Sequence, residues 1–191
     1  DAGLSCVVVA DGAIARADRC RTVNSLSGVE GRAAAAHFGV FRHLIRAPGW
    51  TFETRNRRPP RDPVNALLSF GYTLLTQQVE SAVRTVGLDP YLGFLHQPSY
   101  NRPSLALDLV EAFRTIVVDS VVLGSLNRRQ IEPNAFTYEP EGEYPVLLND
   151  AGRAAFIRAF ETRLAQTFAH PDRDEQVTYR RCFELQARRM A

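Results

Sequence analysis

The stretch from residue 104 to residue 123 constrains the fold most, because apolar side chains surround nearly the whole of the helix that it predicts. A helix that is apolar on all sides is normally buried by its neighbours. The apolar residues are Leu105, Leu107, Leu109, Val110, Phe113, Ile116, Val117, Val121 and Val122. The sequence therefore predicts a buried helix at the centre of the domain.

Proline, glycine and capping residues divide the rest of the chain into further helical runs. Gly87 ends the strongest of them at the C-cap position, and Ser104 is a suitable N-cap for the central helix. The expected helices cover residues 28–46, 64–86, 104–123, 150–168 and 173–189. Residues 136–148 alternate around Glu141 and Gly142, which indicates a hairpin. The predicted class is mainly α, with at most a small β-hairpin.

One face of the central helix is acidic. Asp108, Glu111, Thr115 and Asp119 follow one another at spacings of three, four and four residues. At about 100° per residue they fall within an arc of about 80°. Buried carboxylates must meet cations, donors or water. Either arginines such as Arg114 neutralise them, or Asp108 or Glu111 holds a divalent metal ion, for which carboxylate oxygen is a preferred ligand.

Two residues outside this helix are further candidate ligands. His96 lies in a Gly/Pro-bounded loop, and the chain returns from it through Arg102 into the acidic helix, so its imidazole can reach the first turns. A histidine with carboxylates suits Mn²⁺ and tolerates Mg²⁺. Glu30 has two interpretations. It forms a capping box with Ser27, or its flanking glycines allow another backbone to approach a ligand site.

All 23 basic residues are arginine, and the net charge is only +2. Arginine pairs bidentately with phosphate, although the bias also fits a GC-rich genome. The distribution is more informative than the total, because one short region is crowded with arginines. They are Arg42, Arg46, Arg55, Arg57, Arg58 and Arg61. This region is either a solvated loop or a surface that contacts phosphate.

Cysteine usage and hydropathy bear on location. Cys6, Cys20 and Cys182 are odd in number and widely spaced, which fits a reducing cytoplasm better than a disulfide framework. No run approaches the roughly 18 apolar residues of a membrane span. The sequence predicts a cytoplasmic protein without a membrane partner. Because the chain begins with Asp1 rather than Met, we expect it to be a piece of a longer protein.

Five segments, read together, resemble the CRISPR adaptation integrase family. Their order and spacing agree with the family over roughly residues 27–190, so coincidence is improbable. The segments are Gly28–Ala34, Asp62–Tyr72, Gly87–Pro90, Gly93–His96 and Arg102–Arg114.

The resemblance implies a helical catalytic lobe that binds Mg²⁺ or Mn²⁺. By motif, the metal ligands and catalytic residues are Glu30, His96 and Glu111, with Asp108 as a nearby carboxylate that some members also need. Family members often have Tyr where this chain has His37, which adds a neighbour to the implied metal site.

The family's N-terminal β-rich lobe is absent from this sequence. The resemblance therefore implies two parts. They are an N-terminal connecting segment, residues 1–26, and a helical metal-dependent catalytic domain, residues 27–191.

The implied activity is that of an integrase and DNA endonuclease of prokaryotic cytoplasm, which joins new spacer DNA into the CRISPR repeat by metal-dependent transesterification. The implied partners are prespacer and repeat DNA, a second copy of the chain in a homodimer, and a small dimeric adaptation protein that bridges two integrase dimers. The candidate DNA contacts are Arg57, Arg58, Tyr72, Arg102 and Arg114. Tyr72 has a second interpretation, a hydrogen bond inside the helical bundle.

Two other functions fit the same residues. A non-catalytic helical module of a larger assembly would use the arginines to bind DNA without holding a metal ion. A transposon-encoded integrase relative would share the site and act on different DNA ends.

Overall fold

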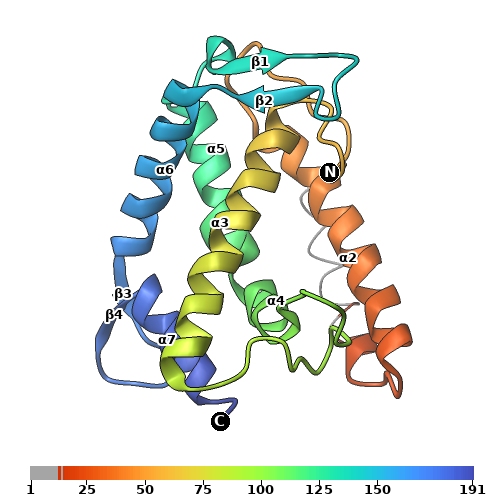
Figure 1. The fold of residues 1–191 in the computed structure, drawn as a ribbon, viewed down its shortest axis with the longest axis vertical. Helices are drawn as coiled ribbons and strands as arrows, with labels where there is room; N and C mark the ends of the chain where they lie inside the picture. The colour runs from red at the N-terminus through yellow and green to blue at the C-terminus, as the bar shows by residue number, and fades with distance from the viewer. Residues whose placement is uncertain (1–12, 14) are drawn as a thin grey trace.

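Helices make up most of the fold in the computed structural model, which describes residue 13 and residues 15–191 (Figure 1). The helices are α2 (Val23–Leu44), α3 (Pro63–Val86), α4 (Ser104–Val110), α5 (Ser120–Asn127), α6 (Asp150–Ala165) and α7 (Tyr179–Arg188). Half of the predicted connecting segment, residues 1–26, lies outside the described residues. None of the described helices is long and apolar enough to cross a membrane. The predicted mainly α class is confirmed.

Helix α3 runs through the middle of the molecule and carries much of the core (Figure 1). Asp62 caps its first turn by accepting a hydrogen bond from the Asn65 N–H at 2.8 Å, and Pro63 occupies the first helical position. Gly87 ends the helix with a positive φ of 90°, which glycine adopts without strain. Helix α3 packs against α4 and α7, so elements that are distant in sequence share one core.

The central buried helix is present but irregular. It consists of α4, a 3₁₀ turn η1 (Glu111–Phe113), a π-helical segment η2 (Arg114–Asp119) and α5. Val117 and Val118 are fully buried, as the apolar pattern predicts. The uniform spacing of about 100° per residue does not hold through η1 and η2, because neither segment has 3.6 residues per turn. The predicted single acidic stripe is therefore divided between two environments.

Gly71 is required where α3 meets η2. A Cβ at this position would lie 2.6 Å from Val118 Cγ1 and 3.0 Å from Phe156 Cζ, both of them buried side chains. Gly71→Ala is therefore expected to lower the free energy of unfolding by about 1–3 kcal/mol through overpacking. Thermal unfolding followed by circular dichroism measures this. Gly39→Ala is the control, since a Cβ there meets nothing within 4 Å, and it is expected to be neutral or stabilising.

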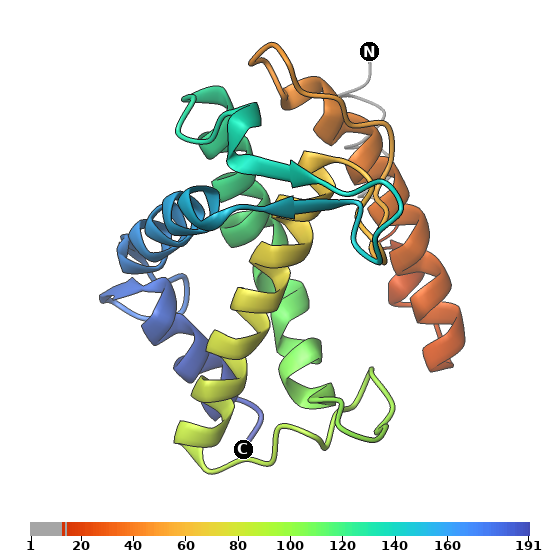
Figure 2. The same cartoon turned by 45° about the horizontal axis from the view of Figure 1, so that its top comes forward.

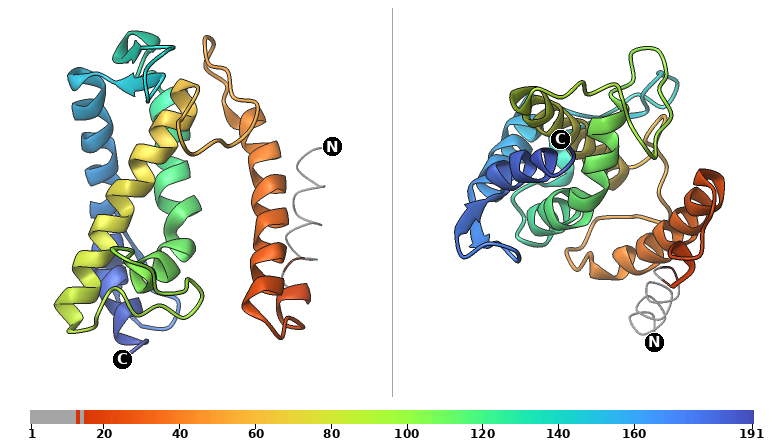
Figure 3. Two further views of the ribbon diagram at one scale, coloured as in Figure 1. Left: turned by 45° about the vertical axis from the view of Figure 1, so that its right-hand side comes forward. Right: turned by 90° about the horizontal axis from the view of Figure 1, so that it is seen from below.

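Helix α2 stands beside the bundle rather than within it (Figures 1 and 3). It begins at Val23, so the predicted start after Ser27 is wrong, and the predicted division at residue 26 lies inside the helix. Thr22 and Ser25 form the capping box. The capping interpretation of Glu30 is therefore wrong too, and Glu30 lies in the interior of α2 with its side chain available for another role.

Two small antiparallel hairpins complete the fold. Strands β1 (Phe136–Tyr138) and β2 (Val146–Leu148) pair across the end of the bundle, as predicted (Figures 1 and 2). A second hairpin, β3 (Thr167–Ala169) with β4 (Gln176–Thr178), was not predicted. Its strands include the last residues of the predicted helix 150–168 and some of the first residues of the predicted helix 173–189. Helix α7 therefore begins only after Thr178, whose side chain caps it. Neither Cys20 nor Cys182 forms a disulfide, while Cys6 lies outside the described residues.

Candidate active site

Two adjoining hollows form what we call the central cleft. The first has a volume of about 360 Å³ and lies between α2 and the η1–η2 segment. The second, of about 700 Å³, lies between α3 and the loop that contains His96. The two hollows share a wall, because both are lined by Arg57, Tyr72, Glu111 and Arg114.

The three predicted metal ligands line this cleft. Glu30 lines the first hollow, His96 lines the second, and Glu111 lines both. They do not converge as closely as predicted, because no three His, Cys, Asp or Glu side chains of the described residues form a group that could hold a metal ion. Two of the three ligands have partners within the protein. Arg114 donates to both carboxylate oxygens of Glu111, at 2.7 and 2.8 Å, and His96 is hydrogen-bonded to Asp108.

Asp108 faces the His96 loop instead of the cleft. Its carboxylate accepts hydrogen bonds from the backbone N–H groups of Phe94 (2.6 Å), Leu95 (3.0 Å) and His96 (2.8 Å), and from His96 Nδ1 at 2.7 Å. Burial opposes ionisation, but these donors hold the pKa of the Asp108 carboxyl below its ordinary value. Asp108 therefore fixes the orientation of the imidazole and leaves Nε2 free for another ligand, as carboxylates commonly do for metal-binding histidines.

Gly93 allows the His96 loop to lie against the start of α4. A Cβ on Gly93 would come within 2.6 Å of Ser104 Cβ and 2.7 Å of the His96 carbonyl oxygen. The Ser104 hydroxyl donates to the Gln97 carbonyl at 3.1 Å, which holds the other side of the loop. The glycine and the serine of the two sequence segments thus position His96 beside the cleft.

Asp119 is a buried carboxylate that the sequence placed on the acidic stripe without a role. It is 2% exposed, and it accepts hydrogen bonds from the Tyr72 hydroxyl at 2.6 Å and from His37 Nε2 at 2.8 Å. The predicted hydrogen bond of Tyr72 inside the bundle is therefore confirmed, although Tyr72 also lines the cleft. Burial, followed by the Asp119 charge, raises the pKa of the Tyr72 hydroxyl, so the phenol stays protonated.

Arginines surround this tyrosine. The Arg114 guanidinium lies 4.6 Å and that of Arg55 5.5 Å from the centre of the Tyr72 ring. Arg55 donates to Asn65 Oδ1 and Ser69 Oγ, and no carboxylate of the described residues pairs with it. Burial lowers the pKa of the Arg55 guanidinium to about 10, so it still carries a positive charge at neutral pH. Arg55 lines neither hollow, so of these two arginines only Arg114 lies in the wall of the cleft, where its charge favours an anionic ligand.

The predicted arginine cluster divides into two parts. Arg57 and Arg58 line the cleft, and so does Arg102 from the His96 loop. Arg42 and Arg46 line neither hollow. All five predicted DNA contacts therefore lie in the cleft, whereas part of the arginine-rich region lies outside it.

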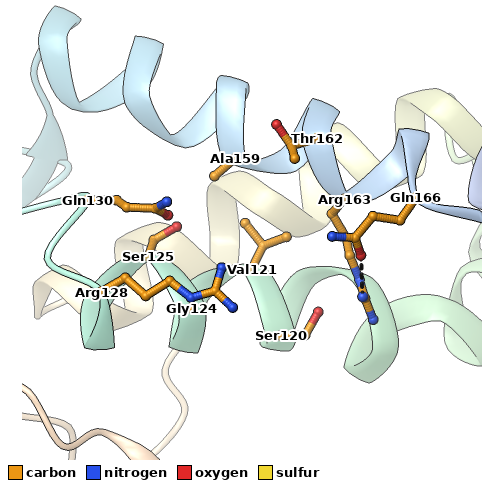
Figure 4. A pocket seen from close by; sticks show the side chains of 10 residues that line it. All are labelled: Ser120, Val121, Gly124, Ser125, Arg128, Gln130, Ala159, Thr162, Arg163 and Gln166. Carbon is orange, nitrogen blue, oxygen red and sulfur yellow. Dashed lines mark hydrogen bonds between the residues drawn. The ribbon is translucent and has the colours of Figure 1, made fainter.

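A separate hollow between α5 and α6 is not a candidate for this chemistry (Figure 4). Its volume is about 210 Å³, and no carboxylate or imidazole lines it. Arg163 crosses from α6 to donate to the Ile116 carbonyl of η2, at 2.9 Å from Nε and 2.6 Å from Nη2. Arg163 thus supports the irregular segment, and the residues that line this hollow offer no group for acid–base or metal chemistry.

The fold and the cleft together define a class of protein. It is a helical domain with an arginine-lined cleft that also carries carboxylate and imidazole side chains. Such a cleft suits a polymer that bears phosphate groups. Residues 8–162 match the family described as CRISPR associated protein Cas1. The chain belongs to the Cas1 family, and the predicted resemblance is confirmed.

Two curated relatives illustrate this similarity. The chain is 46% identical over 176 residues to CRISPR-associated endonuclease Cas1 3 of Thermus thermophilus, a match that covers 92% of this chain and 52% of the relative. It is 44% identical over 175 residues to a CRISPR-associated exonuclease Cas4/endonuclease Cas1 fusion of Geobacter sulfurreducens, covering 89% of this chain and 31% of the fusion. The chain thus spans between about a third and about a half of these relatives.

Solved structures share the fold. A Cas1 protein from Thermotoga maritima has a TM-score of 0.85 at 32% identity, covering 94% of this chain and 55% of that one. A casposase bound to integration product has a TM-score of 0.85 at 25% identity, covering 94% and 50%. A chain of a Cas6-RT-Cas1–Cas2 complex has a TM-score of 0.83 at 26% identity, covering 97% and 20%.

Proposed function

We propose that this chain forms the catalytic part of a CRISPR adaptation integrase and DNA endonuclease of the prokaryotic cytoplasm. The observation that carries the proposal is the position of Glu111, in the wall that the two hollows of the cleft share, with Glu30 in one hollow and His96 in the other. Family membership and the casposase bound to integration product support the same activity.

The donor set of the cleft fits Mg²⁺ or Mn²⁺. Glu30 and Glu111 offer carboxylate oxygens, and His96 offers Nε2, since Asp108 occupies its Nδ1. These three residues would hold the ion once Glu111 exchanges its contact with Arg114. When bound, the metal supplies Lewis-acid stabilisation of the charge on the reacting phosphodiester.

The remaining cleft residues bind and orient DNA. In the proposed transesterification, the 3′ hydroxyl of the incoming DNA attacks a phosphodiester of the repeat, and the bond to the flanking strand breaks to leave a new 3′ hydroxyl. Arg57, Arg58 and Arg102 bind phosphates on both sides of that position. Arg114 is held beside Glu111 by their ion pair and by Tyr72, from where it can neutralise phosphate charge.

The proposed partners are those that the family resemblance implies. A homodimer and a small dimeric partner protein that bridges two such dimers would hold the incoming DNA. The Cas1–Cas2 complex among the similar structures supports a partner of the Cas2 kind. The similarity to the casposase bound to integration product supports a second candidate, an integrase that acts on other DNA ends.

The direct test is strand transfer. The protein is incubated with Mn²⁺ or Mg²⁺, a labelled DNA fragment with free 3′ hydroxyls and a target that contains a CRISPR repeat. We expect labelled joined products, and we expect none to form when the reaction contains EDTA. Binding of DNA with no joining under any metal would favour the non-catalytic DNA-binding module.

Charge reversal in the cleft tests the DNA path. The double variant Arg57→Glu/Arg58→Glu is expected to weaken duplex DNA binding by at least about tenfold and to reduce the dependence of log K on log salt by about 2. Fluorescence anisotropy over a range of salt concentrations measures both. Arg42→Glu/Arg46→Glu is the matched control, because neither side chain lines the cleft. Equal losses of affinity in the two double variants would mean that the net charge of the protein, and not the position of Arg57 and Arg58, determines DNA binding.

A further inference from the structure

A third hollow lies next to the central cleft, between α3, the loop after Arg57 and the β1–β2 hairpin. Its volume is about 440 Å³. This is within the size range of small-ligand pockets, about 300–1,000 Å³. The proposed catalytic residues do not line it, so the reaction derived above leaves it without a role.

The walls of this hollow are largely apolar and partly aromatic. Phe70 comes from the middle of α3, and Val146 and Leu148 come from β2. Tyr144 precedes β2 and is 45% exposed. A flat aromatic surface that is half open to solvent can stack on a planar ligand, whatever the identity of that ligand.

The charged groups of the hollow all have one sign. Arg57, Arg58 and Arg153 line it, and no aspartate or glutamate does. Arg153 is already engaged by the Leu148 carbonyl and by Asp150. Arg57 and Arg58 have no hydrogen bond or ion pair within the described part of the chain, so they are available to an anionic ligand.

The hollow shares a wall with the central cleft. Thr73 and the two free arginines, Arg57 and Arg58, also line the part of the cleft that contains His96 and Glu111. A DNA strand that follows the cleft therefore passes these arginines with its phosphates and can place an adjacent base against the apolar walls. A paired base would first have to leave its stack, at a cost of a few kcal/mol, whereas an unpaired base enters without that cost.

We propose that this hollow binds one unpaired nucleobase of a single-stranded stretch of the substrate DNA, whose neighbouring phosphates contact Arg57 and Arg58. We call it the base pocket. The proposal rests on the proposed function, since it requires DNA in the central cleft. It adds a binding site that holds the strand in register with the reacting phosphodiester.

An abasic scan tests the base pocket. The protein is titrated with partly single-stranded DNA in which each unpaired nucleotide in turn lacks its base, and affinity is measured by fluorescence anisotropy. We expect one position at which the abasic DNA binds about tenfold more weakly, because one stacked base is lost. An equal affinity for every abasic DNA would overturn the proposal, and this result needs no variant protein.

Two tyrosines of the same hairpin provide the matched pair. Tyr144→Ala is expected to weaken binding of the intact DNA about tenfold and to abolish the effect of the abasic position. Tyr138→Ala is the control, since Tyr138 is 56% exposed on β1 and does not line the hollow. If the abasic effect persists unchanged in Tyr144→Ala, the base binds elsewhere and the proposal fails.

The two proposals fail separately. Glu111→Ala is expected to lose strand transfer and to keep the abasic effect, because Glu111 does not line the base pocket. A wild-type protein that shows the abasic effect and never joins DNA would contradict the proposed function alone. One that joins DNA with no abasic effect at any position would contradict the base pocket alone.

Discussion

Glu111→Ala is expected to abolish Mn²⁺ binding and strand transfer together, with a loss of activity of about 10³-fold or more. Glu111 is the one predicted ligand that lines both hollows of the cleft, so neither Glu30 nor His96 can replace it. Glu111→Gln is expected to lose as much Mn²⁺ binding and strand-transfer activity as Glu111→Ala. The amide keeps a hydrogen-bond acceptor for Arg114 and loses the negative charge, which separates metal binding from the ion pair.

Asp108→Ala provides the contrast on the same helix. Asp108 holds His96 through Nδ1 and the loop through three backbone N–H groups, and it does not line the cleft. Its loss is expected to weaken metal binding and activity by about 10–100-fold, the usual effect of removing such a supporting carboxylate. Saturating Mn²⁺ should restore much of the activity of Asp108→Ala. It should restore none of the activity of Glu111→Ala.

Isothermal titration with Mn²⁺ and strand-transfer assays at saturating metal measure both variants. Thermal unfolding serves as the control that each variant is folded. Full activity in Glu111→Ala with a loss in Asp108→Ala would reverse the roles assigned to the two carboxylates.

The helical class could be predicted because apolar periodicity reports burial directly. Most apolar residues of the stretch 104–123 lie in the core as that pattern requires, although Ile116 is 43% exposed, and Gly87 ends α3 where predicted. The π-helical turn of η2 left no such signal, because a change from i→i+4 to i→i+5 hydrogen bonds alters no side chain. The β3–β4 hairpin was missed for a related reason, since each of its strands has only three residues, too few to show a period.

The candidate site could be predicted only as a set of residues. The family resemblance implied Glu30, His96 and Glu111 as one set, and all three line the cleft, as do the candidate DNA contacts Arg57, Arg58 and Arg102. It did not reveal which groups satisfy one another. The pairing of Asp108 with the His96 loop depends on three backbone N–H groups, which look the same in every sequence.

Asp119 connects α2 to the bundle, and this connection positions Glu30. Helix α2 stands to one side of the other helices (Figure 3). His37 of α2 donates to Asp119 at 2.8 Å, and Phe41 of the same helix packs on Phe52 at a ring separation of 5.4 Å. Asn127 of α5 also holds the far end of α2, through hydrogen bonds to the backbone at Leu44, Arg46 and Ala47. The contact of His37 with Asp119 lies closer in sequence to Glu30, so it has the larger share in fixing where Glu30 faces the cleft.

Asp119→Ala is therefore expected to reduce strand transfer by about 10²-fold, the effect of a misplacement of about 1 Å in a reacting group. It should also lower the free energy of unfolding by about 1–3 kcal/mol for each buried donor left without an acceptor. Hydrogen exchange should accelerate throughout α2. Tyr72→Phe is the matched control, because it removes one hydrogen bond to Asp119 and keeps the contact with His37. Unchanged exchange in α2 together with lost activity would mean that Asp119 acts on the reaction through Tyr72 and Arg114 instead of through the position of Glu30.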